Sequence, residues 1–179
     1  ELRVPEDAGS RLRLATLHRR LADVYEAQGH YDRAVAELEA ALDLLSTVEA
    51  HSLERALIHQ SMAWVRRRQG DSRGALEACA RAEKALPPGE LAAAADLKDT
   101  VGVIYRDLGN YAGAADLHHQ SLALREQIDD QRGIAKSLNN LAAVYWHQGE
   151  YTAAVQAYRR SSAISERIGH AAGVASVHN

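Results

Sequence analysis

The chain has 179 residues, of which 46% are hydrophobic and 25% are charged, as in a folded, soluble domain or a short repeat array. The formal net charge of −3 lacks the basic excess that non-specific nucleic-acid binding requires, and no run approaches the roughly 18 apolar residues of a membrane span. One cysteine excludes an internal disulfide and fits a reducing compartment, and the first ten residues contain no apolar signal core. We therefore expect a cytoplasmic protein with no nucleic-acid or membrane partner.

Four glycines recur at nearly even spacing, with steps of 41, 39 and 40 residues. Seven positions before each glycine the residue is small, and five positions after it there is always alanine, so that facing helix backbones can approach closely. Six of the seven tyrosines lie four positions before or two positions after one of these glycines. We expect each glycine to end a helix in the left-handed conformation. The four glycines are Gly29, Gly70, Gly109 and Gly149.

Apolar residues recur at spacings of three and four on both sides of each glycine, the pattern of an amphipathic helix. Before Gly29 this stripe comprises Leu14, Leu17, Leu21 and Val24, which we expect to face the core. In chain order the predicted helices cover residues 11–28, 31–47, 53–69, 72–86, 90–108, 111–127, 130–148 and 151–168, and a last helix begins near residue 171.

Breaks and caps separate these helices. Pro87-Pro88-Gly89 marks a break between the second and third hairpins, and Ser52 and Asp130 are predicted N-caps. The chain begins without Met and stops within a repeat, so we expect it to be a piece of a longer protein. After an N-terminal flank at 1–10, the predicted repeats cover about 11–48, 53–87, 90–128 and 130–168, with a partial fifth at 170–179.

The succession of a small residue, tyrosine, glycine, tyrosine and alanine resembles the tetratricopeptide-repeat (TPR) motif over about residues 11–168. The period of about 40 exceeds the roughly 34 of the standard repeat, and the second hairpin lacks both tyrosines. Such long repeats resemble those of kinesin light chains, cell-polarity scaffolds and the TPR arms of bacterial signalling and transcriptional regulators. Segments 118–145 and 158–179 are most similar to the bacterial regulators. The aromatic residue usual near the start of the first helix is replaced by His18, His59, Lys98 and Leu138.

The resemblance implies an all-α, right-handed superhelix of four helical hairpins plus a partial fifth, whose first helices line a concave groove. Both tryptophans fall on the inferred groove wall, and tryptophan and arginine are typical hot-spot residues. The pair Asn139-Asn140 resembles the asparagines that hold a bound peptide backbone in long-period TPRs, since a side-chain amide both donates and accepts hydrogen bonds. The candidate partner-binding residues are Asp23, Glu26, Gln60, Trp64, Arg67, Arg68, Asp99, Arg106, Lys136, Asn139, Asn140, Trp146 and His147.

The charges of this wall favour a particular partner. Arg66, Arg67, Arg68, Arg106 and Lys136 make its middle basic, so we expect a protein or peptide with acidic and apolar residues across the second to fourth hairpins. Three alternatives remain at this stage. The tryptophans could pack as core, the arginine run could be a solvated face that pairs neighbouring helices, and the two asparagines could cap or bridge helices.

Catalytic and metal signals are weak. The string Gly70-Asp71-Ser72-Arg73-Gly74 matches G-x-S-x-G, but it lies between two helices rather than after a strand. The nine histidines form no metal-binding motif, and no phosphate-binding glycine motif occurs. We expect His118 to be a partly buried helix contact and Cys79 an inert buried thiol. The sequence therefore predicts no enzyme, no metal and no cofactor.

These observations predict a protein–protein interaction module, the scaffold or sensor part of a larger bacterial regulatory protein. One alternative is a ligand sensor for a signalling peptide or small molecule. A second is a self-associating structural arm that forms a homo-oligomer through its open C-terminal end. A third is an enzyme whose site the sequence does not reveal.

Overall fold

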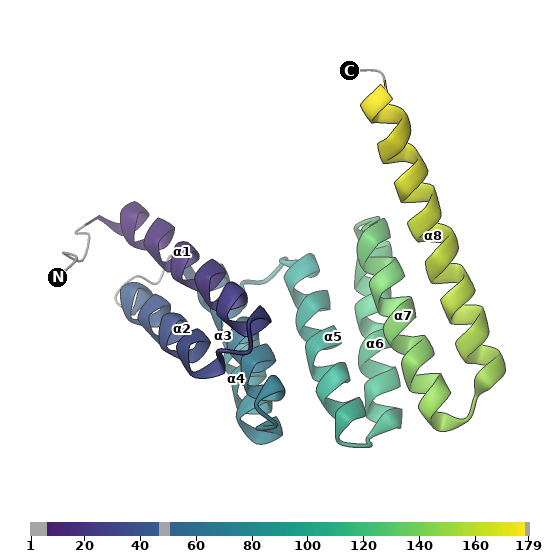
Figure 1. Ribbon diagram of the computed structural model, residues 1–179, viewed down its shortest axis with the longest axis horizontal. Coiled ribbons are helices and arrows are strands. Elements are labelled where there is room, and N and C mark those ends of the chain that lie inside the picture. The colour runs from purple at the N-terminus through teal and green to yellow at the C-terminus, as the bar shows by residue number, and fades with distance from the viewer. Residues whose placement is uncertain (1–6, 47–50, 178–179) are drawn as a thin grey trace. The chain divides into compact units, whose positions relative to one another are not determined.

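The computed structural model describes residues 7–46 and 51–177, with side chains as far as Gly169. Within these ranges there is no strand, and the all-α prediction is confirmed. Three predicted segments lie outside the described residues. They are the first six residues of the N-terminal flank, the end of the first repeat at 47–48 and the last two residues of the partial repeat. The helices are α1 (Ala8–Ala27), α2 (Tyr31–Leu45), α3 (Ser52–Arg68), α4 (Ser72–Ala85), α5 (Leu91–Asp107), α6 (Tyr111–Gln127), α7 (Gln131–Gln148) and α8 (Tyr151–Val177) (Figure 1).

The chain divides into two compact units, Glu1–Glu90 and Leu91–Asn179, which we call the N-terminal and C-terminal units. In the N-terminal unit α1 pairs with α2 and α3 with α4, and α3 also packs on α1 and α2. In the C-terminal unit α5 pairs with α6 and α7 with α8, and α7 also packs on α6 and α5. Figure 1 shows the four helices of the C-terminal unit, from teal to yellow, lying side by side as successive hairpins. Each unit therefore contains one complete hairpin-to-hairpin contact.

The four repeat glycines adopt the predicted left-handed conformation. Their φ angles are 78° at Gly29, 81° at Gly70 and 79° at both Gly109 and Gly149. In each turn the residue after the glycine donates its backbone N–H to the carbonyl five positions earlier, as in the 2.9 Å bond from Glu150 to Tyr145. This bond satisfies a carbonyl that the end of the helix would leave without a partner.

Two glycine-to-alanine substitutions should change stability in opposite directions. At Gly149 an added Cβ meets no atom within 4 Å, so the cost of Gly149→Ala is the left-handed backbone alone, about 1–2 kcal/mol of the free energy of unfolding. Gly169 lies inside α8 with equally open space around it and no positive φ, so Gly169→Ala should stabilise by up to about 1 kcal/mol. Urea unfolding followed by circular dichroism measures both. Equal shifts of the same sign would contradict the conformational explanation.

Helix starts agree with the sequence in one case and not in the other. Asp130 is the N-cap of α7 and accepts a 2.9 Å hydrogen bond from the N–H of Gly133, as predicted. Ser52 is not an N-cap. That place before α3 is taken by His51, whose side chain makes no capping bond, and Ser52 is the first helical residue.

The predicted break after residue 168 is also wrong, because α8 continues from Tyr151 to Val177 as one helix. Gly169 lies within it, and a glycine in a helix interior weakens the helix by about 1 kcal/mol without stopping it. No proline follows to force an end. Within the described residues there is thus no separate helix that begins a fifth hairpin.

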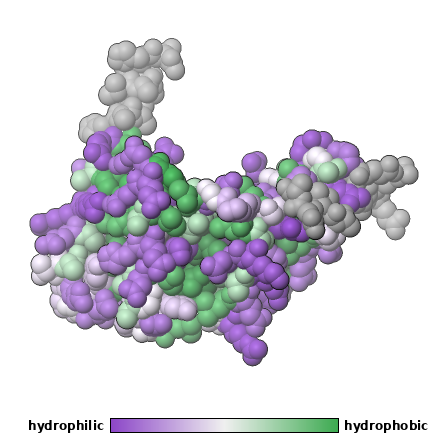
Figure 2. All heavy atoms as spheres, turned by 180° about the vertical axis from the view of Figure 1, so that it is seen from behind, coloured by the Kyte–Doolittle hydropathy of each residue, from purple (hydrophilic) through white to green (hydrophobic). Residues whose placement is uncertain are grey.

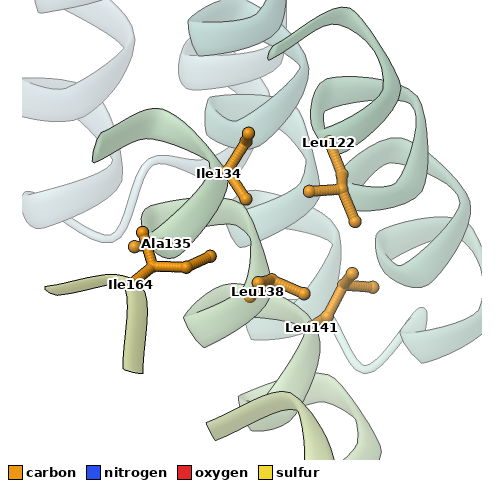
Figure 3. Packing of buried hydrophobic residues seen from close by; sticks show 6 residues of the cluster. All are labelled: Leu122, Ile134, Ala135, Leu138, Leu141 and Ile164. Atoms are coloured by element: carbon orange, nitrogen blue, oxygen red, sulfur yellow. The ribbon is translucent and has the colours of Figure 1, made fainter. Parts of the chain in front are cut away.

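Small residues hold the hairpins closely together, as predicted. Ala34, Ala75, Ala114 and Ala154 are each 0% exposed, and Ala22, Ala63, Gly102 and Ala142 are also buried. In the C-terminal unit these contacts surround a larger apolar cluster. Figure 3 shows Leu122 of α6, Leu138 and Leu141 of α7, and Ile164 of α8 in this cluster.

The apolar stripe of α1 does not face the core. Leu17, Leu21 and Val24 are 60%, 39% and 50% exposed, against the sequence prediction. At the same repeat positions of α3, Ile58, Met62 and Val65 are at most 8% exposed, and α3 packs on α1 and α2. The stripe of α1 is exposed because no earlier hairpin covers it in the described part of the chain.

Candidate functional site

The N-terminal unit brings together most of its predicted wall residues. Nε of Arg68 in α3 lies 3.0 Å from a carboxylate oxygen of Glu26 in α1, an ion pair that places the ends of these two first helices side by side. The guanidinium of Arg67 lies over the ring of Trp64, 5.2 Å from its centroid. Such stacking holds the indole with one face toward a cation. Trp64 is half-buried, so part of it remains available to a partner.

The remaining predicted residues of this unit differ in exposure. Asp23 is exposed, and Gln60 is half-buried. Partial desolvation raises the pKa of the Asp23 carboxyl above its ordinary value; the positive charge of Arg19 opposes this rise, and the negative charge of Glu26 adds to it. Asp23 and Glu26 therefore make the α1 side of the wall acidic.

In the C-terminal unit the wall is carried by α7. Asn139 and Trp146 are exposed and Ala143 between them is half-buried, so the spacing of four and three puts them on one side of the helix. Trp146 is 58% exposed, and its ring meets Tyr151 edge-on with centroids 5.0 Å apart. The alternative that this tryptophan packs as core is wrong. Asn140 is half-buried.

His147, next to Trp146, is exposed at its edge but held in place. Its ring stacks on Tyr111 of α6 with centroids 5.3 Å apart and an interplanar angle of 2°. This contact fixes the end of α7 against α6. The contacts with Tyr151 and Tyr111 therefore hold Trp146 and His147 in defined orientations while their rings remain exposed. This preorganisation lowers the entropy lost on binding.

The assignment of Asp99 to the groove wall is wrong, because its side chain is 0% exposed. Counting back from the repeat glycine puts Asp99 of α5 at the position of Asn139 in α7. Its carboxylate instead turns into the contact between α5, α6 and α7. Oδ1 lies 2.9 Å from Nδ1 of His118, and Oδ2 accepts from Arg125 at 3.1 Å. A partner cannot contact this carboxylate directly.

Asp99 belongs to a buried polar network that the sequence does not predict. Arg125, 3% exposed, also donates at 2.7 Å to Asp96 and at 2.7 Å to Asp130. His118 is 0% exposed rather than partly buried. We define the buried polar network as Asp99, His118, Ser121, Arg125 and Ser137.

Electrostatics explain how these charges remain in the interior. Burial alone would raise the pKa of Asp99, but the hydrogen bond and charge of His118 and the charges of Lys136 and Arg125 outweigh it, so the pKa lies below its ordinary value. Burial likewise opposes the charge of Arg125, yet its bonds to carboxylates raise its pKa above the ordinary value. The network therefore holds a charged carboxylate and a charged guanidinium.

The imidazole of His118 is packed tightly as well as bonded. Its Nε2 has no hydrogen-bond partner, and a Cβ added to Gly102 of α5 would lie 2.8 Å from it. The other first helices carry alanine at the place of Gly102. Glycine is needed there because the histidine fills the space that a methyl group takes elsewhere.

The predicted basic middle of the wall is largely neutralised within the chain. Arg66 lies 3.7 Å from Asp71, Arg106 lies 3.1 Å from Asp107, and Lys136 lies 2.8 Å from Asp96. Arg68 likewise lies 3.0 Å from Glu26. For Arg66 and Arg68, the alternative of a solvated face with paired charges describes the structure. An acidic partner group would have to exchange with these carboxylates.

The residues considered for catalysis have structural roles. The first turn of α4 contains the G-x-S-x-G string, where Asp71 accepts a 2.8 Å hydrogen bond from the N–H of Gly74, and a Cβ at Gly74 would clash with Asp71. Cys79 is 3% exposed, and burial, with the charge of Glu83, raises the pKa of its thiol to about 12. Such a thiol stays protonated near neutral pH. Among the described residues, no group of three or more His, Cys, Asp or Glu could hold a metal ion.

Two hollows open on the surface away from the predicted wall. One of about 500 Å³ in the C-terminal unit is lined by Glu126, Ile134, Arg160, Ile164 and Arg167 among others. One of about 390 Å³ lies beside the α1–α2 turn, between Gly29 and Gln69. None of the predicted partner-binding residues lines either hollow. In the part of the chain that the structure describes, no helix is long and apolar enough to cross a membrane.

A family model described as tetratricopeptide repeat matches residues 13–87 and 91–167, which is most of the chain. The chain belongs to the tetratricopeptide-repeat family. The repeats of this TPR chain coincide with the hairpins of its two units, since each match covers two hairpins. TPR repeats generally mediate protein–protein interactions and are typically non-enzymatic. No curated protein matches the TPR chain in sequence.

Solved structures share the TPR fold at low sequence identity. BtubC (BKLC) from P. vanneervenii is 23% identical with a TM-score of 0.77, over 94% of this chain and 68% of that one. MamA is 15% identical with a TM-score of 0.62, over 87% and 81%. Aspartyl phosphate phosphatase F from Bacillus subtilis is 15% identical with a TM-score of 0.76, over 89% of this chain and 42% of that one. These likenesses show a common helical-repeat fold.

Proposed function

We propose that this TPR chain binds a partner protein or linear peptide through the exposed walls of its first helices, α7 above all. The observation that carries the proposal is Trp146, which is 58% exposed on the same side of α7 as the exposed Asn139. A tryptophan held by Tyr151 offers a large apolar surface with little entropy left to lose. The side-chain amide of Asn139, about two helical turns away, can bond the backbone of an extended partner.

The N-terminal unit offers a second wall of similar chemistry. Trp64 lies beneath the guanidinium of Arg67, and the partly buried Gln60 precedes it by one helical turn. An apolar side chain of a partner could lie on the indole, and its carboxylate could reach the arginine. Because Glu26 and Asp23 make α1 acidic, an acidic group of such a partner should bind near α3 rather than near α1.

The ion pairs within the chain determine which groups of a partner can contribute binding energy. Lys136 and Arg106 already have carboxylate neighbours, so a partner carboxylate must replace Asp96 or Asp107. The exchange keeps the number of ion pairs constant and yields little net energy at an exposed site. Affinity should therefore come mainly from apolar side chains and backbone bonds, and acidic residues should set orientation and association rate.

The wider setting of this function is part of the same proposal. The chain would be the scaffold or sensor arm of a larger bacterial regulatory protein in the cytoplasm, and it would not itself be an enzyme. Support comes from the resemblance of segments 118–145 and 158–179 to bacterial TPR regulators, and from a fold shared with a Bacillus subtilis protein.

Asn139→Ala/Trp146→Ala should abolish capture of the partner by the immobilised chain. Proteins retained from a lysate by the unmodified chain are identified, and binding of the purified partner is then measured by calorimetry. Loss of a central tryptophan costs about 2 kcal/mol or more, so the Kd should rise at least about 30-fold. Gln60→Ala/Trp64→Ala tests the N-terminal wall in the same way.

Leu108→Ala is the matched control, because Leu108 is 55% exposed in the α5–α6 turn and lies outside both walls. All variants are checked by circular dichroism. A partner whose affinity is unchanged by both wall variants would place the binding surface elsewhere on the molecule.

A further inference from the structure

The hollow of about 500 Å³ in the C-terminal unit combines charged side chains with an apolar floor. Its walls come from α6, the α6–α7 turn, α7 and α8, so it is internal to the packing of the third and fourth hairpins. Ile134 and Ile164 form the floor; they are 5% and 8% exposed and belong to the cluster in Figure 3. Small-molecule sites have volumes of about 300–1,000 Å³, so the hollow has room for a small ligand with an apolar part.

Two carboxylates and two guanidinium groups line this hollow, and they are not paired in the same way. Arg160 of α8 donates at 2.9 Å to Glu126 of α6, so these two charges compensate each other. Arg167 donates at 2.9 Å to the side-chain oxygen of Gln131, a neutral group. The Nε2 atom of Gln131 in turn donates to the carboxylate of Asp129. Among the described residues, Arg167 and Asp129 are thus connected through an amide and have no opposite charge as a direct partner.

The repeat itself requires neither of these two charges. Forty positions earlier, Gln127 occupies the place of Arg167, and Gly89, with a φ of 91°, occupies the place of Asp129. Asp129 has a φ of 51° and is the one non-glycine residue with a positive φ in the part of the chain that the structure describes. A left-handed backbone is strained for a residue with a Cβ, so glycine would suit this turn better. The aspartate is therefore explained by its carboxylate and not by the turn.

We propose that this hollow binds a free α-amino acid with a large apolar side chain. The carboxylate of the ligand replaces the Gln131 oxygen at Arg167, and its ammonium group replaces the amide nitrogen at Asp129. The amide of Gln131 already presents an oxygen and a nitrogen to these two side chains in the same order. A zwitterion presents full opposite charges to both, which strengthens the attraction. Its apolar side chain then lies on Ile134 and Ile164 at the floor.

The charge balance of the hollow favours this class of ligand over others. Its two acidic and two basic side chains cancel, so electrostatic complementarity selects a ligand without net charge. A dianion would meet Glu126 and Asp129, and a dication would meet both arginines. Figure 2 shows, on the face behind that of Figure 1, hydrophobic side chains at the surface directly beside hydrophilic ones. None of the predicted partner-binding residues lines the hollow, so this site is additional to the proposed binding walls.

Titration of residues 1–179 with L-leucine, followed by calorimetry and by amide NMR, tests the proposal. The backbone amides of Asp129, Gln131 and Arg167 should shift on binding. Three analogues each lack one recognised group: leucine amide lacks the carboxylate, N-acetyl-leucine lacks the ammonium group and glycine lacks the apolar side chain. Each analogue should bind at least about tenfold more weakly than L-leucine, because it leaves one part of the hollow without its partner.

Variants of the hollow test the same contacts from the side of the protein. Arg167→Gln and Asp129→Gly should each weaken leucine binding at least about tenfold. Glycine adopts the left-handed turn without strain, so Asp129→Gly should keep the fold. Gln131→Ala removes the amide that competes with the ligand and should tighten binding. Arg159→Gln is the matched control, because Arg159 is an exposed arginine of α8 that does not line the hollow.

Asn139→Ala/Trp146→Ala should bind leucine normally, which separates the hollow from the proposed binding wall. Circular dichroism verifies that all variants fold. An unmodified chain that does not bind L-leucine overturns the proposal, and so does one that binds leucine amide or N-acetyl-leucine equally well. Leucine affinity unchanged in both Arg167→Gln and Asp129→Gly also overturns it, because the ligand then lies elsewhere. Weaker binding by Gln131→Ala contradicts the exchange of the amide for the ligand, on which the proposal rests.

Discussion

Asp99→Ala should lower the free energy of unfolding of the C-terminal unit by about 3–5 kcal/mol, the largest effect that we expect from a single substitution. Removal of this carboxylate leaves the guanidinium of Arg125 and the imidazole of His118 buried with fewer partners. Arg125 keeps its bonds to Asp96 and Asp130, but the interior loses the negative charge nearest to His118. An unpaired polar group in the interior costs far more than an exposed ion pair contributes.

Hydrogen exchange followed by mass spectrometry measures this loss separately in the two units. Amides of α5, α6 and α7 should lose protection, while those of α1 to α4 should keep theirs. Glu126→Ala is the matched control, since it removes an exposed carboxylate bonded at 2.9 Å to Arg160, and it should change stability by no more than about 1 kcal/mol. Similar losses in both variants would show that burial of Asp99 is energetically unimportant.

The same carboxylate gives the C-terminal unit a defined sensitivity to acid. The pKa of Asp99 in the folded chain lies below the ordinary value of 3.8, so the unfolded state binds the proton more readily. Its contribution to stability is complete above pH 3.8 and is lost as the pH falls through the lower, folded pKa. Asp99→Asn should remove this part of the acid dependence, which would appear as a flatter stability curve below that pH.

Replacing Asp99 together with its partners His118 and Arg125 should restore the stability that Asp99→Ala removes. The triple variant Asp99→Leu/His118→Leu/Arg125→Leu should be at least as stable as the unmodified chain, and up to about 4 kcal/mol more stable. The N-terminal unit provides the precedent, because Leu38 and Leu45 hold the repeat positions of His118 and Arg125 and are each 0% exposed.

The triple variant leaves no charge stranded in the interior. Ser121 and Ser137 remain bonded to each other at 3.0 Å, and Asp96 keeps its partner Lys136. Urea unfolding of the single and the triple variant in parallel gives the comparison. A triple variant that is destabilised as strongly as Asp99→Ala would mean that the network supplies an interaction that apolar packing cannot replace.

The parts of the fold that could be read from the sequence depend on local geometry. Each repeat requires a glycine where its first helix ends and an alanine where two backbones meet, at fixed distances along the chain. The roles of Gly149 and Ala154 could therefore be predicted from the sequence. The start of α7 was accessible for the same reason, because the capping carboxylate of Asp130 bonds three residues onward. The orientation of Trp146 follows from its place on the helix.

The parts that could not be read depend on partners distant in sequence. Asp99 occupies a position that faces outward in α7, and only the histidine and arginine that α6 brings to it turn it inward. One signal was present: His118 and Arg125 stand where another hairpin of the same chain has leucine. The exposure of the α1 stripe has no sequence signal, because its apolar pattern equals that of a buried stripe. The two differ only in whether another helix covers them in the described part of the chain.

The buried polar network has a consequence for how such arrays can be recombined. Its bonds run from Asp99 on the third hairpin to Ser137 on the fourth, whereas the ion pairs of Arg19 with Glu54 and of Arg68 with Glu26, which join the first two hairpins, remain partly exposed to solvent. Solvent can hydrate a partly exposed charge that loses its partner, but a fully buried charge accepts only a hairpin that carries its counterpart. The third and fourth hairpins should therefore be transferred together when repeats are recombined. A chimaera that separates them leaves a buried charge without its partner, and one that moves both hairpins does not.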